Sequence, residues 1–252
     1  MLFDSIVYGP IRSRRLGVSL GVNLMPTDAK LCSFDCVYCE CGWNQPVSHP
    51  LLPTREQVRQ ALYTQLSTLN TNLDVITFSG NGEPTMHPDF LGIIQDTCAL
   101  RDQYCPNAKV SVLSNSTQLG RVEVVQALKL CDNRILKLDS AIDATMRLID
   151  NPVNHQLIVD QIAEWLMVFN GDFTLQTCFL RGEYKGQIID NTTPQELQAW
   201  YDMVERLHPK QVMIYVIDRA TPLKTLEKIP AEKMEQIAAP LREKGVDVIV
   251  SV

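Results

Sequence analysis

Residues 32–39 read Cys-Ser-Phe-Asp-Cys-Val-Tyr-Cys, and Cys41 follows two positions later. The segment lies in a long connection, residues 25–53, in which no clear helix is predicted. Loops of this length inside a compact domain usually carry function. In a tight loop, three thiolates at these spacings can turn inward together and meet one face of an iron–sulfur cube. A cube has four irons, so one iron would stay open to a substrate or cofactor.

A structural zinc site is the alternative interpretation. Cys32, Cys36, Cys39 and Cys41 would supply the four thiolates that close such a site. Cys39 and Cys41 are separated by one residue, which suits a tetrahedral pocket poorly, because zinc loops favour paired two-residue gaps. We therefore favour the iron–sulfur interpretation and take Cys41 as a small loop residue. The remaining cysteines have no ligand spacing and are expected in the core: Cys98, Cys105, Cys131 and Cys178.

The composition around this segment is that of an ordinary soluble globular protein. The chain has 252 residues, 45% of them hydrophobic, and 23 Lys plus Arg against 29 Asp plus Glu give a net charge of −6. An acidic balance argues against wrapping nucleic acid through bulk charge. The N-terminus does not resemble a signal peptide, and no apolar stretch approaches the ~20 residues that span a bilayer. We therefore expect no membrane partner and a cytoplasmic, reducing location, where clustered cysteines more often bind metal or do redox chemistry.

Short β-branched runs alternate with helical patterns along the chain. Strands are expected over residues 17–24, 74–79, 109–114, 134–139, 173–179 and 211–217, with a last edge strand over 246–250. Helices are expected over residues 54–65 (capped by Thr54), 88–101, 121–130, 153–169, 194–207 and 231–244. Six strand-then-helix units predict an α/β fold, a parallel sheet with helices outside, in one domain over residues 1–252. A barrel and an open doubly wound sheet both fit, and both place chemistry at the carboxyl ends of the strands.

The second and third of these strand ends carry polar turns. Residues 78–84 read Phe-Ser-Gly-Asn-Gly-Glu-Pro, and Gly80 and Gly82 let the backbone approach a ligand closely. A glycine-rich turn before a proline-started helix is the alternative. Ser114 and Asn115 end the third strand, where a simple Asx turn is the alternative to a ligand contact.

The fourth strand ends with two opposite charges. Alternation along the strand places Lys137 and Asp139 on the same face, with Ser140 next to them. In a barrel that face is the interior, where an unpaired charge is costly. The two charges are therefore expected either to form an internal ion pair or to meet polar groups of a ligand.

The last two strand ends carry arginines. Arg181 follows the fifth strand, a loop is expected over residues 182–191, and Tyr215 and Arg219 lie on and after the sixth strand. The predicted topology brings these three side chains to the end of the sheet that carries the cysteines. Arginines there can hold a carboxylate or a phosphate through two hydrogen bonds. Solvated or ion-paired arginines are the alternative.

With the aromatic Tyr38 just before its last cysteine, the segment resembles the signature of the radical S-adenosylmethionine (SAM) superfamily. The resemblance implies a [4Fe–4S] cluster held by Cys32, Cys36 and Cys39, with SAM chelating the open iron. It implies that one electron, from a reductant such as flavodoxin or ferredoxin, cleaves SAM to methionine and a 5′-deoxyadenosyl radical that takes hydrogen from the substrate. The fold it implies is a partial (β/α)6 TIM-like barrel, open laterally because six strands do not close as eight do.

The resemblance extends to the strand ends. The Gly-Asn-Gly-Glu-Pro stretch is similar to the superfamily's Gly-Gly-Glu-Pro motif, which contacts the SAM amino group, and Ser114-Asn115 is similar to its Thr-Asn-Gly segment near SAM. The cofactor-binding residues that the resemblance implies are Tyr38, Gly80, Asn81, Gly82, Glu83, Ser114, Asn115, Asp139 and Ser140. Arg181, Tyr215 and Arg219 are the candidate catalytic residues.

Residues 8–24 together with the cysteine segment are similar to the group of radical SAM enzymes related to wybutosine synthesis, which build a tricyclic base on transfer RNA. Those enzymes carry further cysteines upstream, whereas none precedes Cys32 here. Arg12, Arg14 and Arg15 form the tight basic cluster of the chain, and so few phosphate contacts would bind RNA only weakly. We therefore expect a small molecule or a modified nucleotide as substrate in preference to transfer RNA.

Two other functional classes stay open at the level of sequence. One is an activating enzyme or maturase that abstracts hydrogen from a protein or peptide partner. The other is a non-catalytic iron–sulfur or zinc protein. Anaerobic reconstitution separates the last class from the others, because only an enzyme would cleave SAM after reduction.

Overall fold

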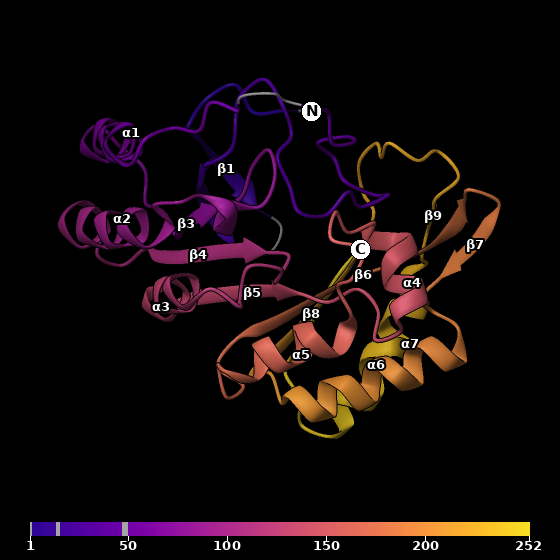
Figure 1. Cartoon of the computed structure of the whole chain (residues 1–252). Helices are drawn as coiled ribbons and strands as arrows, with labels where there is room; N and C mark the ends of the chain where they lie inside the picture. The colour runs from indigo at the N-terminus through magenta and orange to yellow at the C-terminus, as the bar shows by residue number, and fades with distance from the viewer. Residues whose placement is uncertain (1, 14–15, 47–49) are drawn as a thin grey trace. The chain divides into compact units, whose positions relative to one another are not determined.

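The computed structural model describes residues 2–13, 16–46 and 50–252, and the chain divides into two compact units (Figure 1). The first unit comprises Met1–Ser33 and Asn44–Ile135, and the second comprises Phe34–Trp43 and Leu136–Val252. The division falls inside strand β5 (Asn133–Lys137). The single domain expected from the sequence stays a prediction. Of the basic cluster, Arg14 and Arg15 lie outside the described residues.

The sheet of the first unit runs in the order β1-β2-β3-β4. β1 (Val7–Ser13) is antiparallel to β2 (Gly17–Val22), and β2, β3 (Val75–Phe78) and β4 (Lys109–Ser114) pair in parallel. Every residue of β3 is buried, as expected of a strand covered on both faces. β1 was not predicted from the sequence, because most of its residues are exposed and leave no apolar alternation to detect.

Three α-helices and a 3-10 turn accompany these strands among the described residues of the first unit. They are α1 (Arg55–Ser67), η1 (Pro84–Met86), α2 (Phe90–Tyr104) and α3 (Val122–Leu130). The α-helices lie in a row along the strands, α2 between the other two (Figure 1). The predicted cap of the first helix is confirmed, because the Thr54 hydroxyl accepts the Gln57 N–H and the Gln57 side chain accepts the Thr54 N–H.

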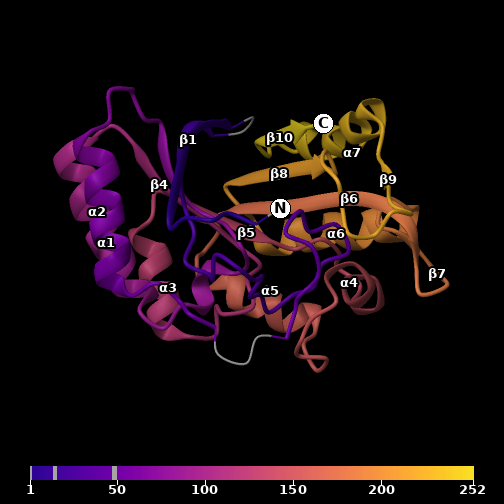
Figure 2. The ribbon, with the colours of Figure 1, turned by 90° about the horizontal axis from the view of Figure 1, so that it is seen from above.

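The second unit is built around a long strand, β6 (Thr174–Tyr184). β8 (Gln211–Val216) pairs in parallel with its first half, and β10 (Val248–Ser251) pairs in parallel with β8. Figure 2 shows β6 running past β8 toward β7 (Gln187–Asp190), which is antiparallel to it, as is the short β9 (Glu227–Lys228).

The prediction of a loop over residues 182–191 is therefore wrong, because most of this stretch belongs to a β-hairpin. Its turn consists of Lys185 and Gly186, both with positive φ, at 51° and 73°. Two consecutive positive φ values define the turn type whose twist matches a tight hairpin. The lysine at the first turn position hides this signal, because glycine, asparagine and aspartate are the residues usually found there.

The helices of the second unit include one that the sequence pattern did not indicate. They are α4 (Asp143–Asp150), α5 (Val159–Met167), α6 (Pro194–Leu207) and α7 (Ala231–Glu243). The predicted bounds of α6 are confirmed, whereas the helix expected over 153–169 begins only at Val159. α4 ends at Asp150, and the next residue, Asn151, has a left-handed φ of 42° and precedes Pro152, a residue that disfavours helix before it.

The prediction of an α/β fold with a largely parallel sheet is confirmed, and each unit has its own apolar core. Phe78 packs edge-on against Phe90 in the first unit, and Phe179 packs edge-on against Trp200 in the second. Cys131 and Cys178 are buried, as predicted, whereas Cys98 and Cys105 are only half-buried. Within the described ranges, no helix has the length and apolar character needed to cross a membrane.

Candidate functional site

The predicted site residues fall into two groups, one in each unit, and the cysteine segment contributes to both. Cys32 belongs to the first unit, whereas Cys36 and Cys39 belong to the second. All three are half-buried and outside any disulfide. In the part of the chain that the structure describes, no three His, Cys, Asp or Glu side chains are already gathered as they would be around a metal ion.

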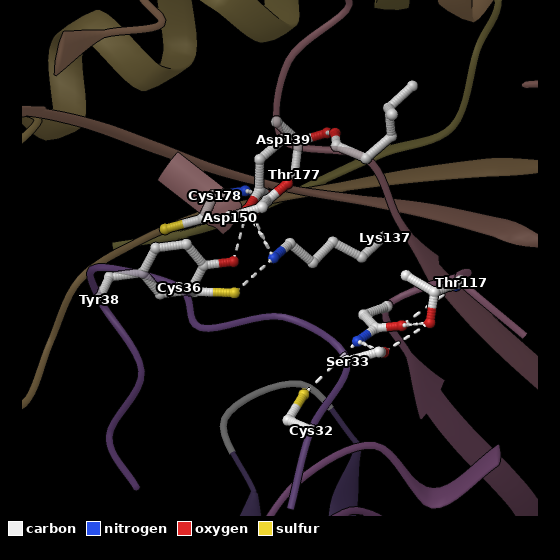
Figure 3. Close-up of polar contacts among 12 residues, drawn as sticks. Cys32, Ser33, Cys36, Tyr38, Thr117, Lys137, Asp139, Asp150, Thr177 and Cys178 are labelled. Carbon is white, nitrogen blue, oxygen red and sulfur yellow. Dashed lines mark hydrogen bonds and ion pairs between the residues drawn. The ribbon is translucent and has the colours of Figure 1, made fainter. Parts of the chain in front are cut away.

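In the first unit, Asn115 directly follows β4 and contacts the segment that holds Cys32. Its side-chain N–H donates to the Cys32 sulfur at 3.5 Å and to the Ser33 hydroxyl at 2.9 Å. The Ser33 hydroxyl also bonds to the Thr117 hydroxyl at 2.6 Å (Figure 3). The residue expected at this strand end therefore meets the first cysteine.

Glu83 joins the turns that follow β3 and β4. Its side chain is almost completely buried and accepts hydrogen bonds from the Ser114 hydroxyl at 2.9 Å, the Asn115 N–H at 2.6 Å and the Thr85 N–H at 3.1 Å. Burial raises the pKa of Glu83 above its usual value, although these hydrogen bonds act to lower it. Glu83 thus fixes the backbone from which Asn115 reaches Cys32.

Gly82 makes a close backbone approach to another part of the chain, whereas its approach to a ligand stays a prediction. It forms a bridge with Leu31, the residue just before Cys32. The Leu31 N–H donates to the Asn81 carbonyl at 2.9 Å, and the Leu31 carbonyl accepts the Glu83 N–H at 3.2 Å. A Cβ atom at position 82 would lie 1.7 Å from the Leu31 carbonyl oxygen. Only glycine permits this contact.

Asn81 and Gly80 also make close contacts that fix the turn at residues 80–83. The fully buried Asn81 side chain donates to the carbonyls of Phe3 and Pro26, both at 2.8 Å, and accepts the Phe3 N–H at 2.8 Å. A Cβ atom at Gly80 would lie 2.4 Å from the Asn23 side-chain oxygen. The Asn81 side chain therefore ties the turn to the N-terminal segment.

Replacing Glu83 with alanine is expected to lower the free energy of unfolding by about 3 kcal/mol, because buried donors on Asn115, Ser114 and Thr85 lose their acceptor. Urea denaturation of the metal-free protein measures this loss. Glu123→Ala is the control, since Glu123 lies at the surface, where its pairing with Arg121 contributes little and its loss should change the transition far less. Equal effects in the two variants would contradict the assigned role of Glu83.

In the second unit, Lys137 at the end of β5 lies at the centre of a buried polar network. Its ammonium group lies 3.0 Å from the Cys36 sulfur, 2.5 Å from an Asp150 oxygen and 3.1 Å from an Asp139 oxygen (Figure 3). The ion pair between Lys137 and Asp139, one of the two expected arrangements, is therefore present. Burial acts to lower the pKa of Lys137, but Asp139 and Asp150 hold this pKa well above its usual value.

Asp139 connects this network to two tyrosines. It accepts a hydrogen bond from the Tyr38 hydroxyl at 2.5 Å and from the Cys178 backbone N–H at 2.8 Å. The Tyr215 hydroxyl donates to that of Tyr38 at 3.4 Å. Burial raises the pKa of both phenols well above the usual value, so both keep their protons at neutral pH.

The part of the cysteine segment in the second unit is fixed by its backbone. The Asp35 N–H donates to the Asp150 carbonyl and the Val37 N–H donates to the Ile149 carbonyl, each at 2.9 Å. The Val37 side chain is fully buried in an apolar cluster with Ile149 and Cys178. The residues on both sides of Cys36 are therefore held against the end of α4 by backbone hydrogen bonds.

The other predicted residues of the second unit lie in different surroundings. The Ser140 hydroxyl donates to the buried Glu196 carboxylate at 2.7 Å. The Arg219 side chain is 70% exposed and pairs with Glu40 at 2.8 Å. Arg181 is partly exposed, and its Nε atom, which is buried, lies 3.8 Å from a Glu227 carboxylate oxygen, beyond hydrogen-bonding distance. The arginines therefore form surface ion pairs, whereas Tyr215 belongs to the buried network.

Sequence reasoning missed Asp150, which completes the network around Lys137. Asp150 is the last residue of α4, and α4 itself was not predicted. No local pattern marks it, because its role depends on contacts with Lys137 and Asp35 that only the fold creates.

Asp150 predicts a pH dependence of stability. Burial raises the pKa of Asp150 to about 7, although Lys137 acts to lower it, while Asp139 opposes Lys137. Because the folded state then binds this proton more tightly than the unfolded state, the stability contributed by Asp150 is fully present below about pH 4 and is lost as the pH rises toward 7. The slope contributed by one proton is at most about 1.4 kcal/mol per pH unit.

Urea denaturation of the metal-free protein from pH 5 to 7.5 tests this expectation. Asp150→Asn should flatten the decline relative to the wild type. Asp172→Asn, which breaks a surface pair with Lys210, should keep it. An Asp150→Asn profile parallel to that of the wild type would contradict the assignment.

Comparison with solved structures shows which class of fold these units have. Streptococcus suis SuiB bound to S-adenosylmethionine has a TM-score of 0.65 at 11% identity, over 88% of this chain and 48% of SuiB. TYW1 with a lysine-pyruvate adduct bound has a TM-score of 0.63 at 15% identity, over 89% of this chain and 73% of TYW1. The anSMEcpe protein with bound AdoMet has a TM-score of 0.57 at 15% identity, over 92% of this chain and 63% of anSMEcpe. The chain has the α/β fold of radical SAM enzymes, as predicted.

Sequence comparison identifies the family. A UPF0026 protein of Synechocystis sp. is 30% identical over 224 residues, which cover 86% of this chain and 77% of that protein. A UPF0026 protein of Helicobacter pylori (strain J99) is 29% identical over 87% of this chain and 68% of its own length. The chain belongs to the UPF0026 family. No family model matches the chain.

A further relative is a Brachyspira hyodysenteriae protein named GTPase Obg, 29% identical over 235 residues. The match covers 91% of this chain but only 32% of that protein. The present sequence has no Gly-Lys pair, which the phosphate-binding loop of GTPases requires, so we do not extend this name to it.

Proposed function

We propose that this chain is a radical SAM enzyme, with a [4Fe–4S] cluster held by Cys32, Cys36 and Cys39. When bound, such a cluster supplies the electron that cleaves SAM to methionine and a 5′-deoxyadenosyl radical. The proposed substrate, a small molecule or a modified nucleotide, gives up a hydrogen atom to that radical. The fold of the chain and the spacing of its cysteines support this proposal.

One observation carries the proposal. The sulfurs of Cys32 and Cys36 each accept a hydrogen bond from a polar side chain at a strand end, Asn115 and Lys137 respectively. Such donors stabilise negative charge on sulfur, which a metal-binding thiolate carries. Outside the segment, burial raises the pKa of Cys131 and of Cys178 and so favours the neutral thiol. The donor set thus suits cluster ligands at the predicted positions.

The other predicted residues divide into three roles under this proposal. Glu83, Asn81 and Gly82 hold the turn beside Leu31, so they position the start of the cysteine segment. Ser140 and the backbone of the turns at 80–83 and 114–115 are the proposed SAM contacts. The partly exposed guanidinium of Arg181 and the exposed guanidinium of Arg219 are the proposed contacts to a carboxylate or phosphate of the substrate.

A protein or peptide substrate is the second candidate. Similar solved structures include SuiB bound to its precursor peptide and anSMEcpe with a peptide. In this chain β7 is a short strand of the hairpin, and its Ile188 side chain is 83% exposed. An extended peptide can add to such a strand. Transfer RNA is disfavoured as a substrate by the net charge of −6.

Anaerobic reconstitution with iron and sulfide tests the proposed function. We expect about four irons per chain and release of 5′-deoxyadenosine from SAM after reduction by flavodoxin, ferredoxin or dithionite. A protein that binds one zinc ion and never cleaves SAM would overturn the proposal. Deuterium transfer into 5′-deoxyadenosine, from labelled nucleotides on one side and labelled peptides on the other, then identifies the substrate class.

A further inference from the structure

Lys137 is a buried cation to which the proposed function assigns no role. Its side chain is only 9% exposed, yet it carries a positive charge among apolar and aromatic groups. The ammonium lies over the Phe34 ring, 4.9 Å from its centroid, and over the Tyr38 ring at 5.1 Å. A buried cation is costly unless it is paired, so such a residue needs strong compensation.

Two carboxylates supply that compensation. Asp150 and Asp139 lie 2.5 Å and 3.1 Å from the Lys137 nitrogen. Both acids are themselves fixed, Asp139 by the Cys178 N–H and Asp150 at the end of α4, where its carbonyl accepts the Asp35 N–H. The ammonium group is therefore held at one place.

A proposed cluster ligand, Cys36, also contacts the ammonium group. In Figure 3 the dashed lines from the Lys137 nitrogen run to the carboxylates on one side and to the Cys36 sulfur on the other. The sulfur is 3.0 Å away, a short distance for a hydrogen bond to sulfur. The cation thus lies between the acids and the thiol.

We propose that Lys137 is a positioning residue that sets the reduction potential of the cluster through its hydrogen bond to the Cys36 sulfur. This inference rests on the proposed function. Reduction adds one negative charge to the cluster and its sulfurs, and a donor with positive charge beside one of them stabilises the reduced state. Asp139 and Asp150 hold the donor in place and keep the buried charge compensated. Lys137 thereby makes it easier for the electron to enter.

A redox titration of the reconstituted protein, followed by electron paramagnetic resonance and carried out without SAM, tests this inference. Lys137→Met removes the charge and the donor. At the wild-type midpoint potential, its ratio of reduced to oxidised cluster should be at least tenfold lower, which is 59 mV for a one-electron couple. Lys137→Arg keeps both properties and should restore most of the shift. Lys210→Met is the control, because it removes the same charge from a surface pair with Asp172 and should change nothing.

The outcomes separate this inference from the proposed function. A wild-type protein that takes up no iron–sulfur cluster would overturn both. A wild-type cluster whose potential is unchanged in Lys137→Met would overturn only the role of Lys137. If Lys137→Met does not retain its cluster, Lys137→Gln, which keeps an N–H donor without the charge, takes its place in the titration. A potential equal to that of the wild type in Lys137→Gln would then overturn the role assigned to the charge.

Discussion

Replacing Cys36 with serine is expected to reduce iron uptake from about four atoms per chain to nearly none and to abolish SAM cleavage. A serine hydroxyl is a poor substitute for a thiolate on iron, and a cube that is held by three protein ligands cannot readily lose one. Iron and sulfide analysis after anaerobic reconstitution measures the first effect, and release of 5′-deoxyadenosine measures the second.

Cys41→Ser is the matched control for this experiment. Cys41 is half-buried in the same segment but lies outside the three-cysteine spacing. We expect this variant to keep its cluster. The free energy of unfolding of the metal-free Cys36→Ser protein should stay close to that of the wild type, because backbone bonds through Asp35 and Val37 hold the segment. A Cys36→Ser protein that retains four irons and cleaves SAM would contradict the ligand assignment.

Replacing Gly82 with alanine is expected to destabilise the metal-free protein by about 3 kcal/mol or more, or to prevent folding. Gly82 has a φ of +152°, which side chains rarely allow, and the added carbon would lie 1.7 Å from the Leu31 carbonyl oxygen. The backbone of Leu31 cannot move away without losing its hydrogen bonds to Asn81 and Glu83. Urea denaturation measures the loss, and iron uptake should fall with it because Leu31 directly precedes Cys32.

Gly42→Ala separates backbone strain from the clash. Gly42 also has a positive φ, +87°, but a Cβ atom there would meet nothing within 4 Å. This variant should cost only about 1 to 2 kcal/mol, the price of the left-handed conformation. If Gly82→Ala were no more destabilising than Gly42→Ala, the contact between Gly82 and Leu31 would not have the structural role assigned to it.

The elements that were predicted well have local signals. The helix that starts at Pro194 has proline in its first turn after Thr193, whose hydroxyl accepts the Glu196 N–H. The helix after Thr54 has a capping box. Such signals depend on residues three or four positions apart, so they can be recognised without knowledge of the fold.

The site was predictable to the same extent. Alternation along the strand expected over residues 134–139 placed Lys137 and Asp139 on one face, and the structure pairs them. In contrast, nothing near Asn81 in the sequence indicates that its side chain bonds to Phe3, which is 78 positions away. Asp150 was not predicted as a site residue for the same reason, since a residue that acts through distant partners leaves no periodic pattern in the sequence.

The way in which the segment 34–43 packs also determines when it can fold during synthesis. Val37 needs the carbonyl of Ile149 and the apolar cluster that includes Cys178, all of which leave the ribosome later. At about 5 to 20 residues per second, the roughly 110 residues between Val37 and Ile149 take about 6 to 20 s to translate. Throughout that interval the thiols of Cys36 and Cys39 are on a nascent chain without their folded surroundings. They are therefore exposed to metal ions and to oxidants before the segment is folded.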